Sequence, residues 1–484
     1  MPIGNKGFIG VKKETTWGSK VVGDNDFYLP FVSETLIANI EEVLSAAQRG
    51  VPDEPKSYQG ERAFAGDVVI EVHPASLGAI LRSAFDVPDT DPAGTTETLL
   101  ENCEDAWNEL VDGGVISGLD VVDYKKGSGS VKIQITADVS AGDICASEVL
   151  ASTDMHLDTA LRFWIKSDVA CDASDLAIRI SEYALCATTG TYKDVLVPAL
   201  VAGVWTECTV TMASMTAFDA VISIGLILMV DKGEMTVNID DIRRVVTGTA
   251  ATAKQHIFIP RQDDFHADCP LNPYTLEVYR DQGDSFQFLG AIFNTLKLDF
   301  STTDKILKAT CGIISKNLGD VAKTSVALET TNPFTWNQAV ISIGDSPVVN
   351  NDILSFGIDY NNACKARYTL NNTVIPRSII RDGFRVTAVN FVIDFVNRTE
   401  YNKFLLGSEQ AFLVKFEGAE IAGNAGVYYT LQIDMPKVQY KAFPINIGGP
   451  GRLTCAVTAK ANYDPTGGVL YAIKAKLINL TQTY

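Results

Sequence analysis

The residue types that most often carry catalysis or bind metal ions are few and scattered in this chain. Its four histidines are His73, His156, His256 and His266, and none has the i, i+4 or Cys-partnered spacing of a metal motif. Its nine cysteines include no C-x-x-C pair, which argues against a zinc site and against a disulfide framework. We therefore predict reduced core thiols, no cofactor, and no catalytic or metal-ligating residues.

Motifs for an activated nucleophile or a bound phosphate are also missing. The sequence has no G-x-S-x-G elbow and no P-loop, and residues 127–130 (GSGS) predict a turn without a following helix. Asp240 and Asp241 are neighbours in a predicted strand, so they point to opposite faces and cannot act together on one substrate. A structural Ca²⁺ ion held by one of them with Glu104 or Asp105 is the alternative left open. We predict a protein that is not an enzyme.

Length and composition indicate a globular chain with several cores. A chain of 484 residues corresponds to about three domains. Hydrophobic residues make up 46%, and the mean hydropathy is +0.10. The longest apolar run, residues 220–230, is far shorter than the ~20 residues that cross a bilayer, so we expect no contact with a membrane. The N-terminal residues lack the apolar run of a signal peptide, and we expect the chain not to be secreted.

The negative charge is concentrated in the middle of the chain. Residues 101–247 contain 10 Lys and Arg against 23 Asp and Glu, a net charge of −13 out of −19 for the whole chain. No stripe of basic residues accompanies this charge. A protein that grips nucleic acid needs such a stripe to neutralise phosphates, so stable DNA binding is excluded as the main function.

The elements that would position a functional surface occur twice. Residues 64–85 and 385–408 each predict a strand with alternating apolar residues followed by a short helix with one apolar stripe. Asn397 is a predicted N-cap of the second helix, which is expected to end at Gly407. The stripes are Leu77, Ile80, Leu81 and Ala84 in the first copy and Tyr401, Phe404 and Leu405 in the second.

The repetition extends to both sides of these units. Upstream, an apolar strand precedes a polar segment rich in Pro, Gly and Arg in both copies, and three strand patterns follow downstream in the same order. The pairs are 27–45 with 353–370, 46–62 with 371–385, 275–281 with 412–418, 295–299 with 430–434, and 310–311 with 454–455. Duplication explains this order. The alternative is that β-rich chains share such patterns by chance.

The middle segment has a different organisation. Residues 86–96 and 247–254 are polar connectors without periodicity, and about eight short alternating runs lie between them. Strands at this spacing, separated by Gly, Asp and Ser turns, are typical of a β-sandwich.

Several of these segments resemble a known family. Residues 13–18 (KETTWG), 29–36 (LPFVSETL), 66–72 (GDVVIEV) and 448–453 (GGPGRL) are similar to the tail tube protein of long-tailed bacteriophages, over roughly 1–98 and 250–484. Residues 101–246 resemble a jelly-roll carbohydrate-binding module of the galactose-binding-like kind, mainly in the strand residues of motifs such as LRFWIK and IDDI.

The resemblance implies a mainly β chain of three domains. We expect two tandem tail-tube domains of β-sandwich or barrel type, each with a short helix, and an inserted β jelly roll. The first tube domain would comprise residues 1–98 and 250–332, the insert residues 99–249, and the second tube domain residues 333–484.

The implied function is structural. The protein would form stacked rings in the tail of a siphovirus-like phage, around a channel for double-stranded DNA, after assembly in the host cytoplasm. With two tube domains a chain, we expect homotrimeric pseudo-hexameric rings, with a homohexamer as the alternative. Other expected partners are the tail terminator, the tail tip and tape measure proteins, and a host-surface glycan at the insert. The alternative function is a secreted or surface glycan-binding protein.

The two polar segments, 46–62 and 371–385, are expected to carry the contact between rings. Both precede the strand–helix unit, and their arginines suit bidentate pairing with carboxylates of the adjoining ring. The alternative is that these side chains are only solvated. The candidate contact residues are Arg49, Tyr58, Arg62, Arg377, Arg381 and Arg385.

Overall fold

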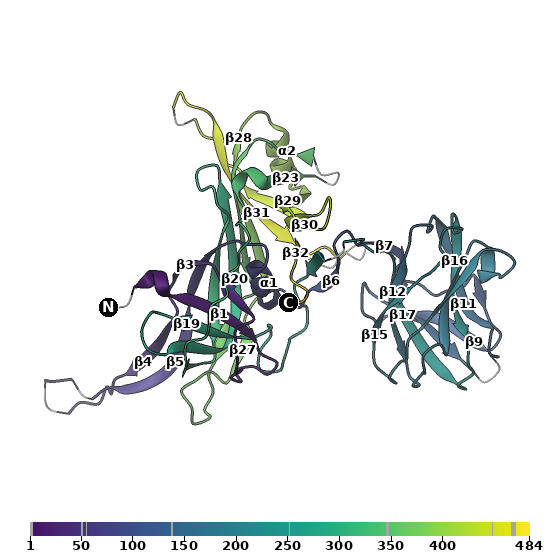
Figure 1. Ribbon diagram of the computed structural model, residues 1–484, viewed down its shortest axis with the longest axis horizontal. Helices are drawn as coiled ribbons and strands as arrows, with labels where there is room; N and C mark the ends of the chain where they lie inside the picture. The colour runs from purple at the N-terminus through teal and green to yellow at the C-terminus, as the bar shows by residue number, and fades with distance from the viewer. Residues whose placement is uncertain are drawn as a thin grey trace. The chain divides into compact units, whose positions relative to one another are not determined.

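The computed structural model describes residues 3–49, 52–54, 56–136, 139–250, 252–344, 348–447, 449–465 and 471–484. The chain forms two compact units (Figure 1). The first comprises residues 1–90, 251–464 and 471–484, and the second residues 91–250 and 465–470. Antiparallel strands dominate both units, and the described residues contain two α-helices, so the prediction of a mainly β protein is confirmed.

In the first unit, one succession of elements occurs twice. We call these successions the first and the second repeat. The first repeat contains η1 (Gly4–Lys6), β1 (Phe8–Lys13), β2 (Phe27–Leu29), β3 (Phe31–Glu34), β4 (Ile37–Val43), β5 (Tyr58–Glu71), α1 (Ser76–Ala84), β18 (Lys254–Phe258), β19 (Tyr274–Tyr279), β20 (Ser285–Ser301), β21 (Lys308–Ser315) and β22 (Asn317–Val321). The second contains η3 (Trp336–Gln338), β23 (Ala339–Ile343), β24 (Val348–Val349), β25 (Ile353–Asn361), β26 (Cys364–Arg367), β27 (Ser378–Arg381), β28 (Val386–Asp394), α2 (Thr399–Leu406), β29 (Glu409–Glu420), β30 (Tyr428–Ala442), β31 (Thr454–Asn462) and β32 (Lys474–Asn479).

Strand pairing follows the same order in both repeats. In the first repeat the order is β4-β5-β21-β20-β19-β1. In the second repeat it is β25-β28-β31-β30-β29-β23. All of these pairs are antiparallel. The order of strands predicted from the sequence repeat is therefore present in the topology, which pattern similarity alone would not produce. The predicted correspondence of residues 295–299 with 430–434 is wrong, because 430–434 lie between β29 and β32 as residues 285–289 lie between β19 and β22.

Helix α1 is completely buried. Its apolar stripe packs into the core of the unit, and all nine residues are buried. Glu329 accepts hydrogen bonds from the backbone N–H groups of Ala75 and Ser76, at 2.8 Å each, so this carboxylate caps the helix from a distant segment. Gly78 leaves room for the ring of Tyr484, since a Cβ atom there would lie 2.1 Å from it.

Helix α2 lies at the surface. Tyr401 and Phe404 pack against Phe443, with ring centroids 5.8 and 6.4 Å apart, as the stripe predicts. The expectation that Leu405 shares this buried stripe is wrong, because the residue is 63% exposed. The helix ends at Gly407 with φ 65°, as expected. Asn397 precedes the N-cap position and accepts a hydrogen bond from the backbone N–H of Thr399 at 2.8 Å.

The polar segments 46–62 and 371–385 are parts of two long hairpins rather than simple loops. The first hairpin joins β4 to β5, and β5 begins at Tyr58. The second joins β26 to β27, which ends at Arg381. Both hairpins extend from the first unit in Figure 1, the first in purple and the second in green. Apolar and polar residues alternate too weakly in these segments for the strands to be recognised in the sequence.

The second unit, the insert, consists of two packed sheets. One has the order β15-β12-β17-β10-β9 with β7 beside β17, and the other β14-β13-β16-β11-β8. Its own core includes Trp107 and Phe163. Its elements are β7 (Thr96–Glu101), β8 (Leu110–Val111), β9 (Val115–Asp120), β10 (Ser130–Ile135), β11 (Ile144–Thr153), β12 (Ala160–Ser167), β13 (Leu176–Ser181), η2 (Ala184–Cys186), β14 (Tyr192–Leu196), β15 (Thr206–Thr211), β16 (Val221–Leu228) and β17 (Met235–Val246), preceded by β6 (Asp89–Pro92).

Two further predictions concern the whole chain. All nine cysteines are buried and free, which confirms the prediction of core thiols. No helix among the residues that the structure describes is long and apolar enough to span a membrane.

Candidate assembly surfaces

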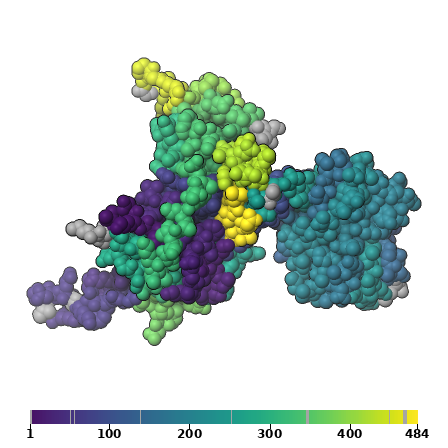
Figure 2. All heavy atoms as spheres, viewed as in Figure 1, coloured from purple at the N-terminus to yellow at the C-terminus, as the bar shows by residue number. Residues whose placement is uncertain are grey.

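Strand β4 is an open edge of the first repeat. It pairs with β5 on one side, and no pairing on its other side is found among the described residues. Ile37 is 63% exposed, and Ile40 and Val43 are 44% exposed. An exposed edge with apolar side chains is a ready template for pairing with another chain. The hairpin that β4 begins projects from the rest of the unit (Figure 2).

The corresponding strand of the second repeat, β25, is not open. Its outer edge pairs with β20 of the first repeat over seven residue pairs, from Thr295 with Asn361 to Ser301 with Ser355. One continuous sheet, β5-β21-β20-β25-β28-β31, therefore crosses from one repeat to the next.

The far end of this sheet is open as well. Strand β20 continues to Ser301, whereas its counterpart β30 ends at Ala442 and pairs with residues 458–462 of β31. Residues 454–457 of β31 pair with β28 only, among the pairings of the described residues. In the chain, β25 lies beside the distal part of β20. No strand among the described residues takes the equivalent place beside residues 443–447 of the second repeat.

The contact residues predicted on the first hairpin are accessible, with one exception. Arg49 and Tyr58 are exposed, Tyr58 by 55%. Arg62 is half-buried, and Nη2 donates a hydrogen bond to Gln59 Oε1 at 2.8 Å. Its backbone N–H donates to Val374 O at 2.8 Å, so Arg62 lies against the second hairpin.

The predicted residues on the second hairpin are engaged within the chain. Arg377 forms an ion pair with Asp268 at 2.7 Å, and Arg381 Nε lies 3.6 Å from Asp264. Arg385 donates to Asn362 Oδ1 at 3.2 Å and to the backbone carbonyl of Arg261. Burial lowers the pKa of Arg385. These three arginines hold the second hairpin to the first repeat.

The continuous sheet has one apolar and one polar face. Alternate residues of its six strands are buried in the core, and those between them form what we call the polar face. A groove of about 450 Å³ runs along this face over β20, β25, β28 and β31. The charged residues of the polar face are Glu61, Asp67, Glu71, Asp299, Asp359, Asp394, Lys297, Lys308 and Lys460. Six carboxylates against three lysines make the face weakly acidic.

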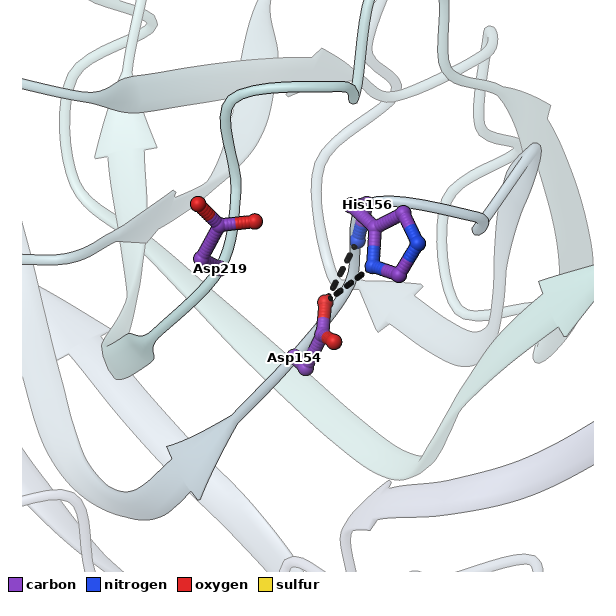
Figure 3. Close-up of side chains that lie close together, drawn as sticks. All are labelled: Asp154, His156 and Asp219. Carbon is purple, nitrogen blue, oxygen red and sulfur yellow. Dashed lines mark hydrogen bonds and ion pairs between the residues drawn. The ribbon is translucent and has the colours of Figure 1, made fainter.

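One cluster of ionisable side chains in the insert has the residue types of a metal or catalytic site. Asp154, His156 and Asp219 are close together and exposed, and His156 Nδ1 lies 2.6 Å from Asp154 Oδ1 (Figure 3). This hydrogen bond raises the pKa of His156. The pair lies at the surface of the insert, where Arg244 donates to the backbone carbonyl of Asp154 and also lies 3.5 Å from the buried carboxylate of Asp158.

Among the described carboxylates of the insert, Asp240 is the most buried. Its Oδ2 accepts backbone hydrogen bonds from Lys125 at 2.6 Å and from Lys126 at 2.7 Å, which fixes the loop after β9 on the sheet. Burial raises the pKa of Asp240 to about 6. Glu104 similarly accepts the backbone N–H of Ser128 at 2.8 Å, while Asp105 is exposed. These carboxylates fix loops, and calcium binding by them stays a prediction.

A family model described as phage tail tube protein matches residues 4–464. This chain belongs to the phage tail tube protein family. The match covers the first repeat, the insert within it and the second repeat as far as residue 464, so a structural role in the tube of a phage tail follows from membership, and so does self-assembly into that tube. The family is structural rather than enzymatic. No curated protein matches the chain.

Solved structures similar to this tail tube protein include carbohydrate-binding modules. A crystal structure of a family 30 module is 12% identical and covers 32% of this chain and 89% of its own, with a TM-score of 0.24. The xylan-binding domain CBM22-1 from Paenibacillus barcinonensis is 13% identical and covers 34% of this chain and 99% of its own, with a TM-score of 0.23. The sandwich fold of the insert is established by its own strand pairing.

Proposed function

We propose that this tail tube protein forms stacked rings in the tail of a long-tailed, siphovirus-like phage, and that the channel they enclose conducts double-stranded DNA. The observation that carries the proposal is the continuous sheet that joins the two repeats through β20 and β25. Assembly would take place in the host cytoplasm, with the tail terminator, tail tip and tape measure proteins as further partners.

Rings would close by the same pairing that joins the repeats. The in-chain junction puts β25 beside the distal end of β20. By the duplication, β4 of one chain takes the equivalent place beside residues 443–447 and 454–457 of the next chain. This pairing removes both open edges, which a soluble protein otherwise has to protect. The polar face of the continuous sheet would then form the wall of the channel, and its excess of carboxylates suits a polyanion that must slide.

A ring of three chains would contain six repeats. Electron microscopy of the purified protein is expected to show tubes. Class averages of single rings should show six wall segments, in which the first and the second repeat alternate around the ring. Native mass spectrometry of isolated rings should give three chains. Six chains a ring would instead support the homohexamer, and a protein that stays monomeric at high concentration would contradict the tube function.

The tip of the first hairpin is proposed to contact the next ring. Arg49 and Tyr58 are its accessible members, whereas Arg62, Arg377, Arg381 and Arg385 would position the two hairpins.

The variant Arg49→Ala/Tyr58→Ala is expected to form normal rings but shorter tubes that separate at lower salt. Each exposed ion pair contributes only about 0.5 kcal/mol, but the contact recurs at every ring interface. The length distribution in micrographs at several salt concentrations is the measurement. Arg398→Ala/Tyr428→Ala, which removes an exposed arginine and an exposed tyrosine elsewhere, is the matched control. Wild-type tube lengths from the hairpin variant would exclude this contact.

The insert is proposed to lie outside the tube. It folds around its own core, and a segment of net charge −13 in the channel would oppose the entry of DNA. Binding of a host-surface glycan by this unit remains a proposal that a glycan array can test.

A further inference from the structure

Lys297 lines the groove on the polar face, and two carboxylates flank it. Its Nζ lies 2.8 Å from Oδ2 of Asp299, two residues further along β20. Across the junction of the repeats, Lys297 is the register partner of Asp359 in β25. Directly opposed side chains of an antiparallel pair interact, so both carboxylates act on the same ammonium group.

The surrounding residues keep these carboxylates in place. Gly357 is the register partner of Asp299, and a Cβ atom at Gly357 would lie only 2.7 Å from Asp299 Oδ1. The absence of a side chain there leaves the space that the Asp299 carboxylate occupies. On the other side, Asn390 Nδ2 donates a hydrogen bond to Asp359 Oδ2 at 3.0 Å. The arrangement is therefore built from three neighbouring strands.

The charges in this cluster influence one another. The hydrogen bond to Asp299 raises the pKa of Lys297, which keeps the amine protonated. Burial raises the pKa of Asp359, and the positive charge of Lys297 opposes that effect. Lys297 and Asp299 remain about half exposed toward the groove, so a phosphate group could reach the ammonium if the carboxylates were absent.

We propose that Asp299 and Asp359 neutralise Lys297 on the channel wall, so that the wall does not hold the phosphates of passing double-stranded DNA. The inference rests on the proposed tube function. Lysines that contact phosphates release counterions from DNA, and such contacts add up along a duplex. A lysine repeated in every ring would otherwise form a continuous phosphate-binding track.

The test compares tubes of the wild type with tubes of Asp299→Asn/Asp359→Asn. Tubes are first verified by electron microscopy and then sedimented with a short fluorescent DNA duplex at low and at high salt. We expect the variant tubes to retain about fivefold more duplex at low salt and to lose it at high salt, because the contact is electrostatic. Equal retention by wild-type and variant tubes would overturn the proposal.

Two control variants isolate Lys297. Adding Lys297→Gln to the double variant should return retention to the wild-type level. Asp382→Asn removes the partner of Lys365, 2.7 Å away in the second hairpin, and frees a lysine outside the polar face. Increased retention in this control, or no reversal by Lys297→Gln, would show that net charge alone is responsible.

Failure of the proposed function would be recognised separately, because the wild-type protein would then form no tubes. If the double variant does not assemble, Asp299→Asn alone takes its place, since this carboxylate is 48% exposed and makes only the contact to Lys297 among the ion pairs of the described residues. The same retention and salt criteria apply to the single variant.

Discussion

A chain carrying Glu41→Pro is expected to stay folded but to form no rings. Glu41 lies at the bulge of β4, where the register with β5 shifts between Ile40 and Glu42. Proline is tolerated at bulges and on edge strands, but it lacks the N–H group that a neighbouring strand would accept. A junction the size of β20–β25, with seven residue pairs, contains about seven backbone hydrogen bonds. At about 1 kcal/mol each it contributes about 7 kcal/mol, and each ring would contain three such junctions between chains.

Light scattering and electron microscopy measure the loss of rings, and circular dichroism verifies the fold of the monomer. Glu41→Ala is the matched control, because it removes the same carboxylate, which accepts the backbone N–H of Glu61 at 3.1 Å, and keeps the N–H group. Rings should form from the alanine variant. Rings of normal size from Glu41→Pro would show that β4 is not the edge that joins neighbouring chains.

Acid is expected to destabilise the first unit through His256. This ring is fully buried, with Nδ1 2.9 Å from Thr90 Oγ1 and Nε2 3.0 Å from Thr481 O. Burial lowers the pKa of His256 from 6.5 to about 4. Because the unfolded chain binds the proton more readily, this histidine's contribution to stability is complete above pH 6.5 and is lost as the pH falls to 4. The loss amounts to about 3 kcal/mol.

Hydrogen exchange in β18 and β32, corrected for intrinsic rates at each pH, measures this effect. The variant His256→Gln should show a smaller change between pH 7 and pH 4.5, whereas His266→Gln, at an exposed histidine, should behave like the wild type. Peptides of β12 in the insert provide an internal reference, because protonation of Asp240, whose pKa is raised to about 6, has the opposite sign. An unchanged pH dependence in His256→Gln would contradict the assignment.

The sequence by itself determined which strands and helices form, because its strongest signals are local. Alternating residues such as Val68 and Ile70 specify a strand with one buried face, and the spacing of Leu77 and Leu81 specifies a helix that lies on a sheet. These patterns recur in the second copy, so the duplication could be recognised without coordinates. The motifs around residues 13–18 and 66–72 led to the family that the comparison with known proteins confirmed.

Helix α2 marks the limit of this local reasoning. Its stripe placed Leu405 with Tyr401 and Phe404, but the neighbouring structure covers only the last two. A stripe tells which residues share a face of a helix, whereas burial depends on what other segments pack there. Helix α1 is buried on every side because distant residues, among them Glu329 and Tyr484, lie against it.

The tertiary structure alone decided where the two repeats join and which residues face the groove. Lys297, Asp299 and Asp359 are ordinary strand residues in the sequence, and only the pairing of β20 with β25 brings them together. The tertiary structure also shows which predicted contact residues are accessible. Arg49 and Tyr58 are exposed, whereas Arg377 and Arg381 form ion pairs within the chain. Pairing between strands about 60 residues apart depends on long-range register, and periodicity in the sequence carries no information about which strands become neighbours.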